Sequence, residues 1–484
     1  MAGKRRRHHR GPATSPKPLP HEASRWDAAR RAIQPGIPCR ALNKRPVGTK
    51  TTQSLKALGF TRHPPVRNPD YPQMNQKKLI VAYLLASTCF TKELFGVVIG
   101  GSVVDLYLIA ISAYGLLIGL ANPFVMRIGL CWAGLFALSA MLLSVFGYEM
   151  DILVNQGLPA AFIFMGIGGL LGFTNSASLL RAYRRVCLGA ACFGILQFVA
   201  SLGGLRLLMK ESGRLDSLTY EPSHYAIVVA PAVFLALREM VLSRRFVDWG
   251  NWVLLVSLGL TFSVTGLILL IVSLVLTLFR RSGYIAIIAM AVLFFSYRSI
   301  EAYLPEEIRG RIGDFSEAVE GDGESYEATN LSVLSPLTNW EVAGDGFAKG
   351  RILGKGIGGH YHAYHEYYGM TSFADDYRFG TNAIGGHSLF IRSFSEFGLL
   401  GLAAYLGLVF LGLREVSRDL RPWLILLAIH LIGRMIKLGG FMEIGLPLFI
   451  LAPFAFNQVF ATTAKASTRR RRARPLNRAT AIAQ

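Results

Sequence analysis

The sequence predicts an all-α, polytopic membrane protein, a bundle of about 11 to 12 transmembrane helices with one large extracytoplasmic loop. Three observations predict this class. Hydrophobic residues make up 52% of the 484 residues and charged residues only 17%. The apolar residues form long blocks, most of which can cross a hydrocarbon core of about 30 Å at about 1.5 Å per residue. The charged residues gather between these blocks and in two basic tails.

The apolar blocks define the organisation of the chain. They fall at 79–99, 103–121, 128–147, 158–174, 186–208, 223–241, 251–279, 283–297, 388–413, 422–438 and 441–460. We therefore expect an N-terminal transmembrane bundle over 79–297, a large loop over 298–387, and C-terminal transmembrane helices over 388–462. The number of crossings depends on the block at 251–279.

The basic charge of the chain lies in its tails. Residues 1–78 hold 18 Lys and Arg and 3 Asp and Glu, and residues 463–484 hold 7 and none, so the tails account for the formal net charge of +21. Basic clusters that flank membrane spans are typical of cytoplasmic ends near anionic lipids. No aromatic platform accompanies the arginines, which argues against nucleic-acid binding. The tail 1–78 is rich in Pro and polar residues and is expected to be largely disordered.

The arginines of the short loops fit a topology with both tails in the cytoplasm. The block 251–279 tests this topology, because Arg244-Arg245 and Arg280-Arg281 flank it on both sides while its 29 residues suit one full crossing only. We therefore predict a short or re-entrant hairpin that turns near 263–266, where small polar residues can satisfy the freed backbone. The outward connections are then 209–222 and 298–387, and the second is expected to hold short helices near 305–320 and 337–349.

The first outward loop carries the first candidate site residues. It contains Arg214, Tyr220 and Glu221, and Pro222 and His224 lead into the next apolar block. An arginine and a glutamate at one membrane edge suit a phosphate and a sugar hydroxyl. The alternative is an arginine that snorkels to the interface and a helix that simply begins at proline.

The second outward loop adds cations, glycines and histidines. Arg309, Arg311 and Arg351 precede a glycine-rich stretch at 354–359, which lacks the Gly-Lys-Ser/Thr ending of a nucleotide loop and reads as a tight turn. The histidines that follow are His360, His362 and His365. They lack the carboxylate of a metalloprotease motif, so the sequence indicates no metal site. The five cysteines show no pairing pattern in the loops.

A resemblance appears where the second loop meets the next apolar block. His387-Ser388, nine residues, Gly398, two residues and Gly401, after a Gly-x-Gly turn, resemble the signature of the bacterial O-antigen polymerase and O-antigen ligase superfamily. The Arg214 loop is similar to the Arg…Glu-Pro-Ser stretch of its exopolysaccharide and capsule polymerases. The likeness covers roughly residues 180–415.

This resemblance implies a metal-independent, inverting glycosyltransferase on the outer face of the bacterial cytoplasmic (inner) membrane, without a cofactor. Its donor would be an undecaprenyl-pyrophosphate-linked glycan, with a chain-length regulator and a flippase as possible partners besides membrane lipids. His387 would be the general base. Arg214 and a second arginine would hold the pyrophosphate. The remaining predicted substrate-binding residues are Glu221, Tyr220, His224, Arg309, Arg351 and Glu396.

The sequence departs from the family at the second arginine. Family members commonly carry an arginine a few residues before a tryptophan, but the residues before Trp340 are Ser335 to Asn339. We take Arg311 as the substitute. Arg392 and Glu396 are i, i+4 neighbours on a helix and can simply pair. The alternative for His387 is a surface histidine at a helix start, with Ser388 as the N-cap.

Three functions stay open. The first is a polymerase that joins lipid-linked repeat units into exopolysaccharide, capsule or O-antigen, and the second is a ligase that transfers the finished glycan to lipid A–core or another acceptor. The third, of another class, is a lipid-glycan transporter or flippase, which would predict paired charges inside spans. The sparse charges in the apolar regions, which could instead line the mouth of a lipid-glycan cavity, are Lys92, Glu93, Asp105, Arg434, Lys437 and Glu443.

Overall fold

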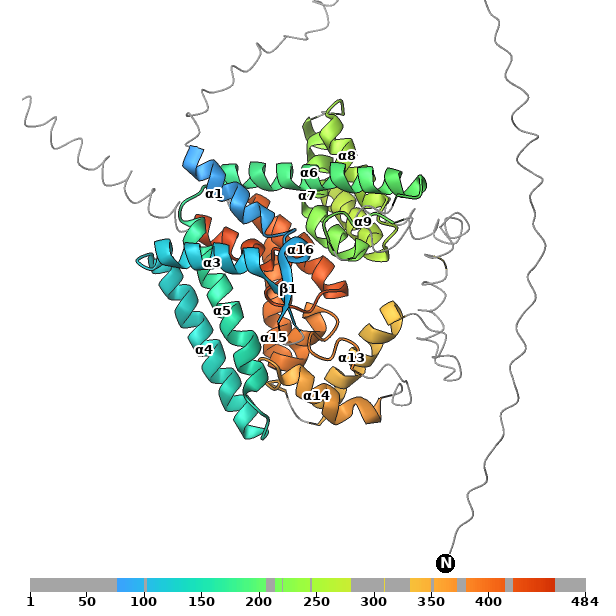
Figure 1. The fold of residues 1–484 in the computed structure, drawn as a ribbon. Coiled ribbons are helices and arrows are strands. Elements are labelled where there is room, and N and C mark those ends of the chain that lie inside the picture. The colour runs from blue at the N-terminus through green and yellow to red at the C-terminus, as the bar shows by residue number, and fades with distance from the viewer. Residues whose placement is uncertain are drawn as a thin grey trace, which may run out of the picture. The chain divides into compact units, whose positions relative to one another are not determined.

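The computed structural model describes much of the predicted bundle (Figure 1). The described residues are 76–99, 102–205, 214–219, 221–243, 246–279, 309, 331–349, 352–371, 380–413 and 421–457. The two basic tails, the apolar block at 283–297 and the predicted helix near 305–320, apart from Arg309, lie outside them. All the contacts below belong to the compact unit that spans 72–484.

The described chain is mostly helical, as predicted. Five of its helices are long and apolar enough to cross a membrane, which supports a membrane protein. They are α4 (Pro123–Val145), α5 (Asp151–Leu171), α6 (Ser176–Leu202), α7 (Pro222–Ser243) and α15 (Leu389–Leu413). Shorter apolar helices are α3 (Leu106–Gly119), α9 (Val264–Phe279), α16 (Arg421–Ile436) and a last helix, Leu446–Asn457. The total of about 11 to 12 crossings and the large extracytoplasmic loop remain expectations.

Side chains just before the helices explain where several of them begin. Asn122 accepts a hydrogen bond from the amide of Phe124 ahead of α4, and Asn175 accepts one from Ser178 in α6. Asp105 does the same for α3. Such caps satisfy amides that have no partner in the first helical turn. Proline at the first position of α4 and of α7 needs no such partner.

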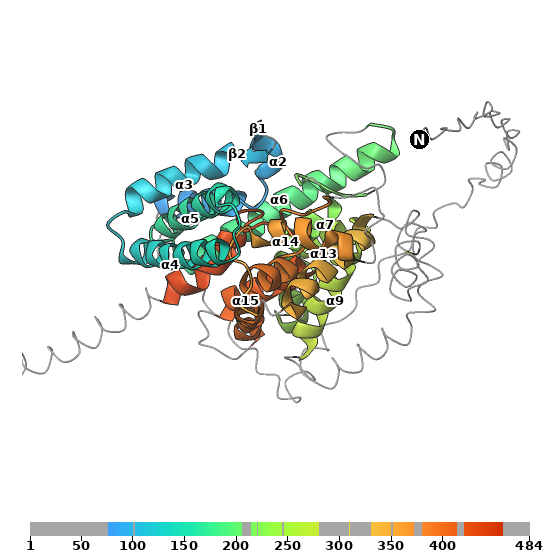
Figure 2. The same cartoon turned by 90° about the horizontal axis from the view of Figure 1, so that it is seen from below.

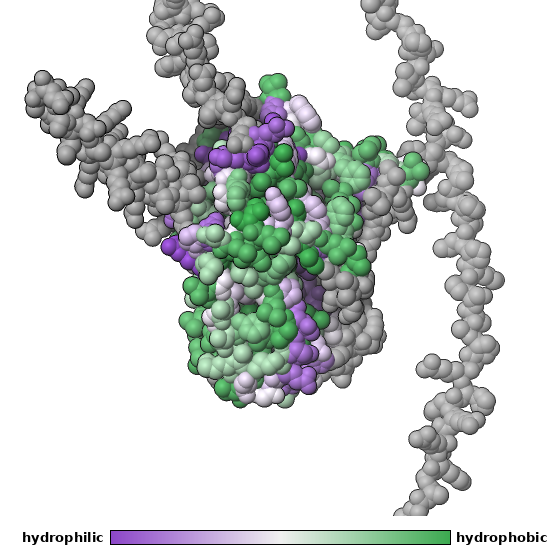
Figure 3. Space-filling model, turned by 60° about the vertical axis from the view of Figure 1, so that its left-hand side comes forward, coloured by the Kyte–Doolittle hydropathy of each residue, from purple (hydrophilic) through white to green (hydrophobic). Residues whose placement is uncertain are grey.

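The helices differ in how deeply they lie in the bundle. In α7, 78% of the apolar window is buried, whereas in α4 the share is 22%. The exposed side of α4 presents large hydrophobic side chains such as Leu130 and Val145, at 70% and 72% exposure. Figure 3 shows hydrophobic side chains over much of one face of the molecule. This distribution suits α7 to the interior of a membrane bundle and α4 to contact with lipid.

Glycines let α3 and α5 approach closely. An added Cβ on Gly115 would lie 2.1 Å from the carbonyl oxygen of Gly166, and one on Gly169 would lie 2.0 Å from the carbonyl oxygen of Gly115. Small residues at such spacing allow close backbone contact between membrane helices, where packing and not hydrophobic exclusion supplies the association energy.

The prediction for the first apolar block was wrong. Residues 79–99 do not form one span, because α1 (Gln76–Ser87) ends early and a short helix α2 (Lys92–Phe95) follows. Strands β1 (Gly96–Ile99) and β2 (Ser102–Asp105) then pair antiparallel, so the fold is not purely α. Polar residues around Thr91 interrupt the apolar run, and the paired valines of the two strands favour a β conformation.

A break in the block 251–279 is confirmed, and it lies at 260–263, at the edge of the predicted turn near 263–266. Helix α8 (Trp249–Gly259) ends before the polar segment, and α9 begins at Val264. Thr261 and Phe262 lie in the turn between them, with Phe262 at φ +43°.

Much of the described part of 298–387 is helical. Helix α13 (Leu331–Ala348) confirms the helix predicted near 337–349, and α14 (Gly359–Tyr367) follows with a 3-10 turn at Tyr368–Met370. Both helices lie beside α15 (Figures 1 and 2). The loop therefore packs against the start of α15, where the candidate general base is found.

Candidate active site

His387 lies in a tight turn immediately before α15. Its backbone is left-handed at φ +59°, following Gly386 at φ +62°. Ser388 accepts a hydrogen bond from the amide of Ile391 at 3.2 Å, which confirms it as a cap of α15. A left-handed non-glycine residue is strained and persists only where its surroundings hold it. The imidazole is only 8% exposed, so the ring points into the protein and not into solvent.

Polar side chains of α13 and of the 380–388 turn surround the ring of His387. Its Nδ1 lies 3.1 Å from the Oγ of Ser335 and 3.4 Å from the amide nitrogen of Asn382. Asn382 also donates to the Oγ of Ser335 at 2.8 Å. The ring further hydrogen-bonds to the backbone of Ile436 at the end of α16. Residues from three separate parts of the chain therefore fix the orientation of the base.

A second layer joins this cluster to α14. The side-chain nitrogen of Asn339 donates to the carbonyl oxygens of Ser335 at 2.7 Å and Thr381 at 3.3 Å. Its oxygen lies 2.8 Å from Nε2 of His360. Burial, with the nearby cations of Arg392 and Lys355, lowers the pKa of His360 to about 3. His360 is thus a neutral, hydrogen-bonded core residue.

Charged groups from the start of α7 and from the segment after α16 interact electrostatically with His387. Lys437 forms an ion pair with Glu221, and Ser223 donates to the same carboxylate oxygen at 3.1 Å. Nε2 of His224 lies 3.8 Å from that oxygen. Burial alone would raise the pKa of Glu221, but Lys437 and His224 outweigh it and lower the value to about 2.

These groups determine the protonation of His387. Burial and the ammonium of Lys437 lower the pKa of His387, and the carboxylate of Glu221 partly opposes them, which gives a value of about 3. The imidazole is therefore neutral near pH 7 and keeps a lone pair for a proton, although its lowered pKa makes it a weaker base than an exposed histidine. Glu221 favours the imidazolium electrostatically, whereas burial and Lys437 disfavour it.

A neighbouring ion pair stabilises the segment that carries Lys437. Lys92 binds Glu443 at 2.6 Å. Arg434, fully buried in α16, donates to the carbonyl oxygens of Gly440 at 2.6 Å and Leu438 at 3.3 Å, and also to that of Glu443. A buried guanidinium with several carbonyl partners holds this segment in one conformation.

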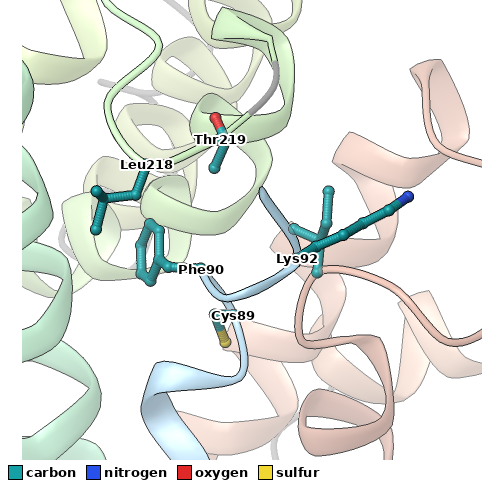
Figure 4. A pocket seen from close by; sticks show the side chains of 6 residues that line it. Cys89, Phe90, Lys92, Leu218 and Thr219 are labelled. Carbon is teal, nitrogen blue, oxygen red and sulfur yellow. The ribbon is translucent and has the colours of Figure 1, made fainter. Parts of the chain in front are cut away.

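A small pocket opens beside Lys92 (Figure 4). Its walls come from the segment after α1, from the 214–219 loop and from the turn before the last helix. The lining residues are Cys89, Phe90, Lys92, Leu218, Thr219 and Ile444. The pocket has an apolar wall, and its one cation, Lys92, is already paired with Glu443.

Arg214 is buried at 7% exposure, beside the turn between α8 and α9. Its guanidinium donates to the carbonyl oxygens of Thr261 at 3.3 Å and Phe262 at 3.5 Å. These contacts bind the outward loop to the α8–α9 turn. They stabilise the fold, and the predicted binding of phosphate by Arg214 stays a prediction.

Glu396 and Arg392 form the predicted i, i+4 pair, at 2.9 Å. The same carboxylate accepts the amide of Gly358 at 2.8 Å, and the carbonyl of Glu396 accepts that of Gly356 at 2.7 Å. Glu396 has no exposed surface. It holds the glycine-rich turn against α15, and its predicted contact with substrate remains untested.

The glycine-rich stretch is a turn, as the sequence indicated, and the amides of its residues 356–359 donate hydrogen bonds within the protein. Besides the two amides bound by Glu396, the amide of Ile357 donates to Ser139 of α4 at 3.1 Å. At Gly398, φ +58° breaks α15, and an added Cβ there would lie 1.7 Å from the carbonyl oxygen of Ile352. An added Cβ on Gly401 would lie 2.2 Å from the carbonyl oxygen of Ser393. Both motif glycines thus permit close backbone packing.

The other histidines of this loop lie apart from His387. His362 stacks on Tyr148 with ring centroids 4.7 Å apart, and His365 lies against Tyr361 at 4.4 Å. Among the described residues, no three His, Cys, Asp or Glu side chains come together as ligands for a metal ion. Of the predicted arginines, Arg309 is described and exposed. Arg311 and Arg351, like Tyr220, lie outside the described residues.

Of the predicted residues, the structure thus brings together His387, Glu221 and His224. Sequence reasoning missed Ser335 and Asn382, and it noted Lys437 only as an isolated charge. A lone lysine next to an apolar run was the available signal for Lys437, whereas nothing local marks Ser335 or Asn382. No protein-family model matches the sequence, and no curated protein is significantly similar to it.

Proposed function

We propose that the protein is an integral-membrane glycosyltransferase that joins undecaprenyl-pyrophosphate-linked oligosaccharide units into a polysaccharide. One observation carries the proposal. A neutral, buried histidine at the start of a candidate span contacts Ser335 and Asn382 and interacts electrostatically with the Lys437–Glu221 pair. Such an arrangement supplies an oriented, neutral imidazole with a lone pair, as a general base requires.

The proposed reaction is a single displacement. A hydroxyl of the acceptor sugar loses its proton toward His387 as its oxygen bonds to the anomeric carbon of the donor. The bond from that carbon to the pyrophosphate oxygen breaks, and the lipid pyrophosphate leaves with the electron pair. The leaving group is already activated, so the transfer needs no nucleotide. Fixed cations near the membrane surface would stabilise the leaving pyrophosphate, and Arg214 and Arg311 are the proposed groups.

One further feature of the described residues is compatible with this proposal. Both motif glycines have a structural role, because Gly398 lets the turn at 352–354 pack against α15 and Gly401 lets the two parts of α15 approach each other across the helix break. The polymerase is preferred to the ligase because of the Glu221-Pro222-Ser223 stretch.

The transporter alternative has one observation in its favour. The pairs Lys437–Glu221 and Lys92–Glu443 are ion pairs close to apolar helices, and paired charges of this kind also mark substrate pathways in transporters. A flippase moves the lipid-linked unit without changing it, so product analysis separates the two functions.

The test is incubation of the purified protein in lipid vesicles with an undecaprenyl-pyrophosphate-linked repeat unit, in EDTA, with and without lipid A–core. The proposal predicts a ladder of lengthened lipid-linked glycans without lipid A–core. Product only in the presence of lipid A–core would identify a ligase. Movement of the intact unit across the vesicle membrane, with no new glycosidic bond, would identify a transporter.

A further inference from the structure

Contacts on both sides of the His387 ring define its tautomer. Nδ1 lies 3.4 Å from the amide nitrogen of Asn382, which only donates, so Nδ1 is an acceptor. The backbone hydrogen bond at Ile436 favours the protonated ring, as an accepting carbonyl does. With Nδ1 as an acceptor, the neutral ring carries its proton on Nε2, and Nδ1 is the nitrogen that can take a proton.

The hydroxyl of Ser335 stands in front of that nitrogen. Ser335 accepts a hydrogen bond from Asn382 at 2.8 Å and lies 3.5 Å from the amide nitrogen of Asn339. Its own proton is then directed to Nδ1 of His387, 3.1 Å away. The side chain is 2% exposed.

Thr338, a second buried hydroxyl residue of α13, makes the usual hydrogen bond within its own helix and serves as a comparison for Ser335. Its Oγ1 donates to the carbonyl of Leu334 at 3.0 Å, one turn back in α13. Such back-bonding is the usual fate of Ser and Thr inside helices. The hydroxyl of Ser335 is directed instead to a titratable ring in another element, although both residues are buried in α13.

We propose that Ser335 is a further catalytic residue, a proton relay between the acceptor hydroxyl and Nδ1 of His387. The inference rests on the proposed function. As the acceptor oxygen bonds to the anomeric carbon and the pyrophosphate leaves with the electron pair of the broken bond, the acceptor proton moves to Oγ of Ser335. The serine proton moves to Nδ1 in the same step. Ser335 ends neutral, and the charged or titratable groups that act on the imidazolium are Lys437, Glu221 and His224.

The experiment compares the full chain in lipid vesicles, as wild type, Ser335→Ala, Ser335→Thr and the matched control Thr338→Val. The substrate is the undecaprenyl-pyrophosphate-linked repeat unit. Ser335→Ala should lower kcat by roughly 10- to 100-fold, within the range of proton-transfer catalysis, with KM for the repeat unit little changed. Ser335→Thr should restore part of the rate because it keeps a hydroxyl. Thr338→Val should stay close to wild type.

Solvent isotope effects provide a readout that a purely structural role would not change. If two protons move in the rate-determining step, the rate of the wild type should depend on the deuterium fraction of the solvent along a curve. In Ser335→Ala, where one proton moves, the dependence should be linear. The tautomer is tested independently by the ¹⁵N resonances of the His387 ring in the folded wild type, which does not depend on how the variants fold. A proton on Nδ1 would overturn the relay.

The outcomes separate the relay from the proposed function. If His387→Ala is inactive while Ser335→Ala keeps the wild-type kcat and isotope effect, the relay is wrong and the glycosyltransferase stands. If His387→Ala is as active as the wild type, the proposed function of this site fails, and the relay fails with it.

Discussion

Gly398→Ala should destabilise the protein more than any ordinary glycine replacement in the same helix. Gly398 interrupts α15 at φ +58° and ψ −143°, a conformation that side chains other than glycine rarely adopt. An alanine Cβ would lie 1.7 Å from the carbonyl oxygen of Ile352 and 2.8 Å from the amide nitrogen of Gly354. Both are backbone atoms, so no side-chain rotation relieves the contact.

The magnitude follows from two contributions. The backbone conformation costs about 1 to 3 kcal/mol for a residue with a Cβ. The turn must also move away from α15, which breaks the hydrogen bond from the amide of Leu399 to the carbonyl of Ile352, now 3.1 Å long, at about 1 kcal/mol. We expect a loss of about 3 kcal/mol in the free energy of unfolding.

Gly407→Ala is the matched control. It lies in the same helix, and an added Cβ meets nothing within 4 Å. Alanine favours a helix over glycine by up to about 1 kcal/mol, so this variant should be neutral or slightly more stable. The assay is reversible unfolding of both variants in mixed detergent micelles. Equal stability of the two variants would refute the proposed packing of the turn against the helix break.

Three further predictions concern buried or partly buried charges. Because the pKa of Glu221 falls from 4.5 to about 2 on folding, its pair with Lys437 stabilises the protein above about pH 4.5, and that contribution is lost as the pH falls toward 2. A double-mutant cycle of Glu221→Gln and Lys437→Met should therefore give a coupling energy in unfolding of about 1 to 2 kcal/mol at pH 7 and much less at pH 3. Equal coupling energies at the two pH values would contradict the pairing. Arg392→Met should cost about 3 to 5 kcal/mol in a thermal unfolding assay, and adding Glu396→Gln should recover most of it, since the loss comes from an unpaired buried carboxylate. Arg214→Ala should lower the free energy of unfolding by about 1 to 2 kcal/mol even without substrate, because the carbonyls of Thr261 and Phe262 lose their hydrogen-bond donor. An unchanged stability would contradict these contacts.

Hydropathy predicted those helices whose apolar runs are continuous. Helices α7 and α15 fall close to their predicted blocks, whereas α5 and α6 begin seven and ten residues before the blocks at 158–174 and 186–208. The polar residues near Ser263 indicated the break between α8 and α9. The prediction of one span over 79–99 failed because mean hydropathy does not distinguish β-branched residues from leucine and averages out single polar residues. Val97 and Val98 raise the mean hydropathy as leucines would, yet they pair with Val103 and Val104 in a hairpin.

The candidate site was predictable only where a residue stood in a local motif. His387 and Glu221 belong to such motifs, and the structure brings them into electrostatic contact. Lys437 meets Glu221 across more than two hundred positions of sequence, and Ser335 reaches His387 from another helix. No spacing rule encodes pairings of this kind, because they depend on how α7, α13 and α16 pack.

The most direct test of the central claim is the rate of glycosidic bond formation by His387→Gln, measured against the wild type and Thr338→Val in the same lipid vesicles. The variant keeps a polar side chain of similar reach but lacks a group that accepts a proton at pH 7. The account predicts a loss of about 10²- to 10⁴-fold in kcat, with unfolding behaviour close to that of the control. A wild-type rate in a folded His387→Gln protein would contradict it.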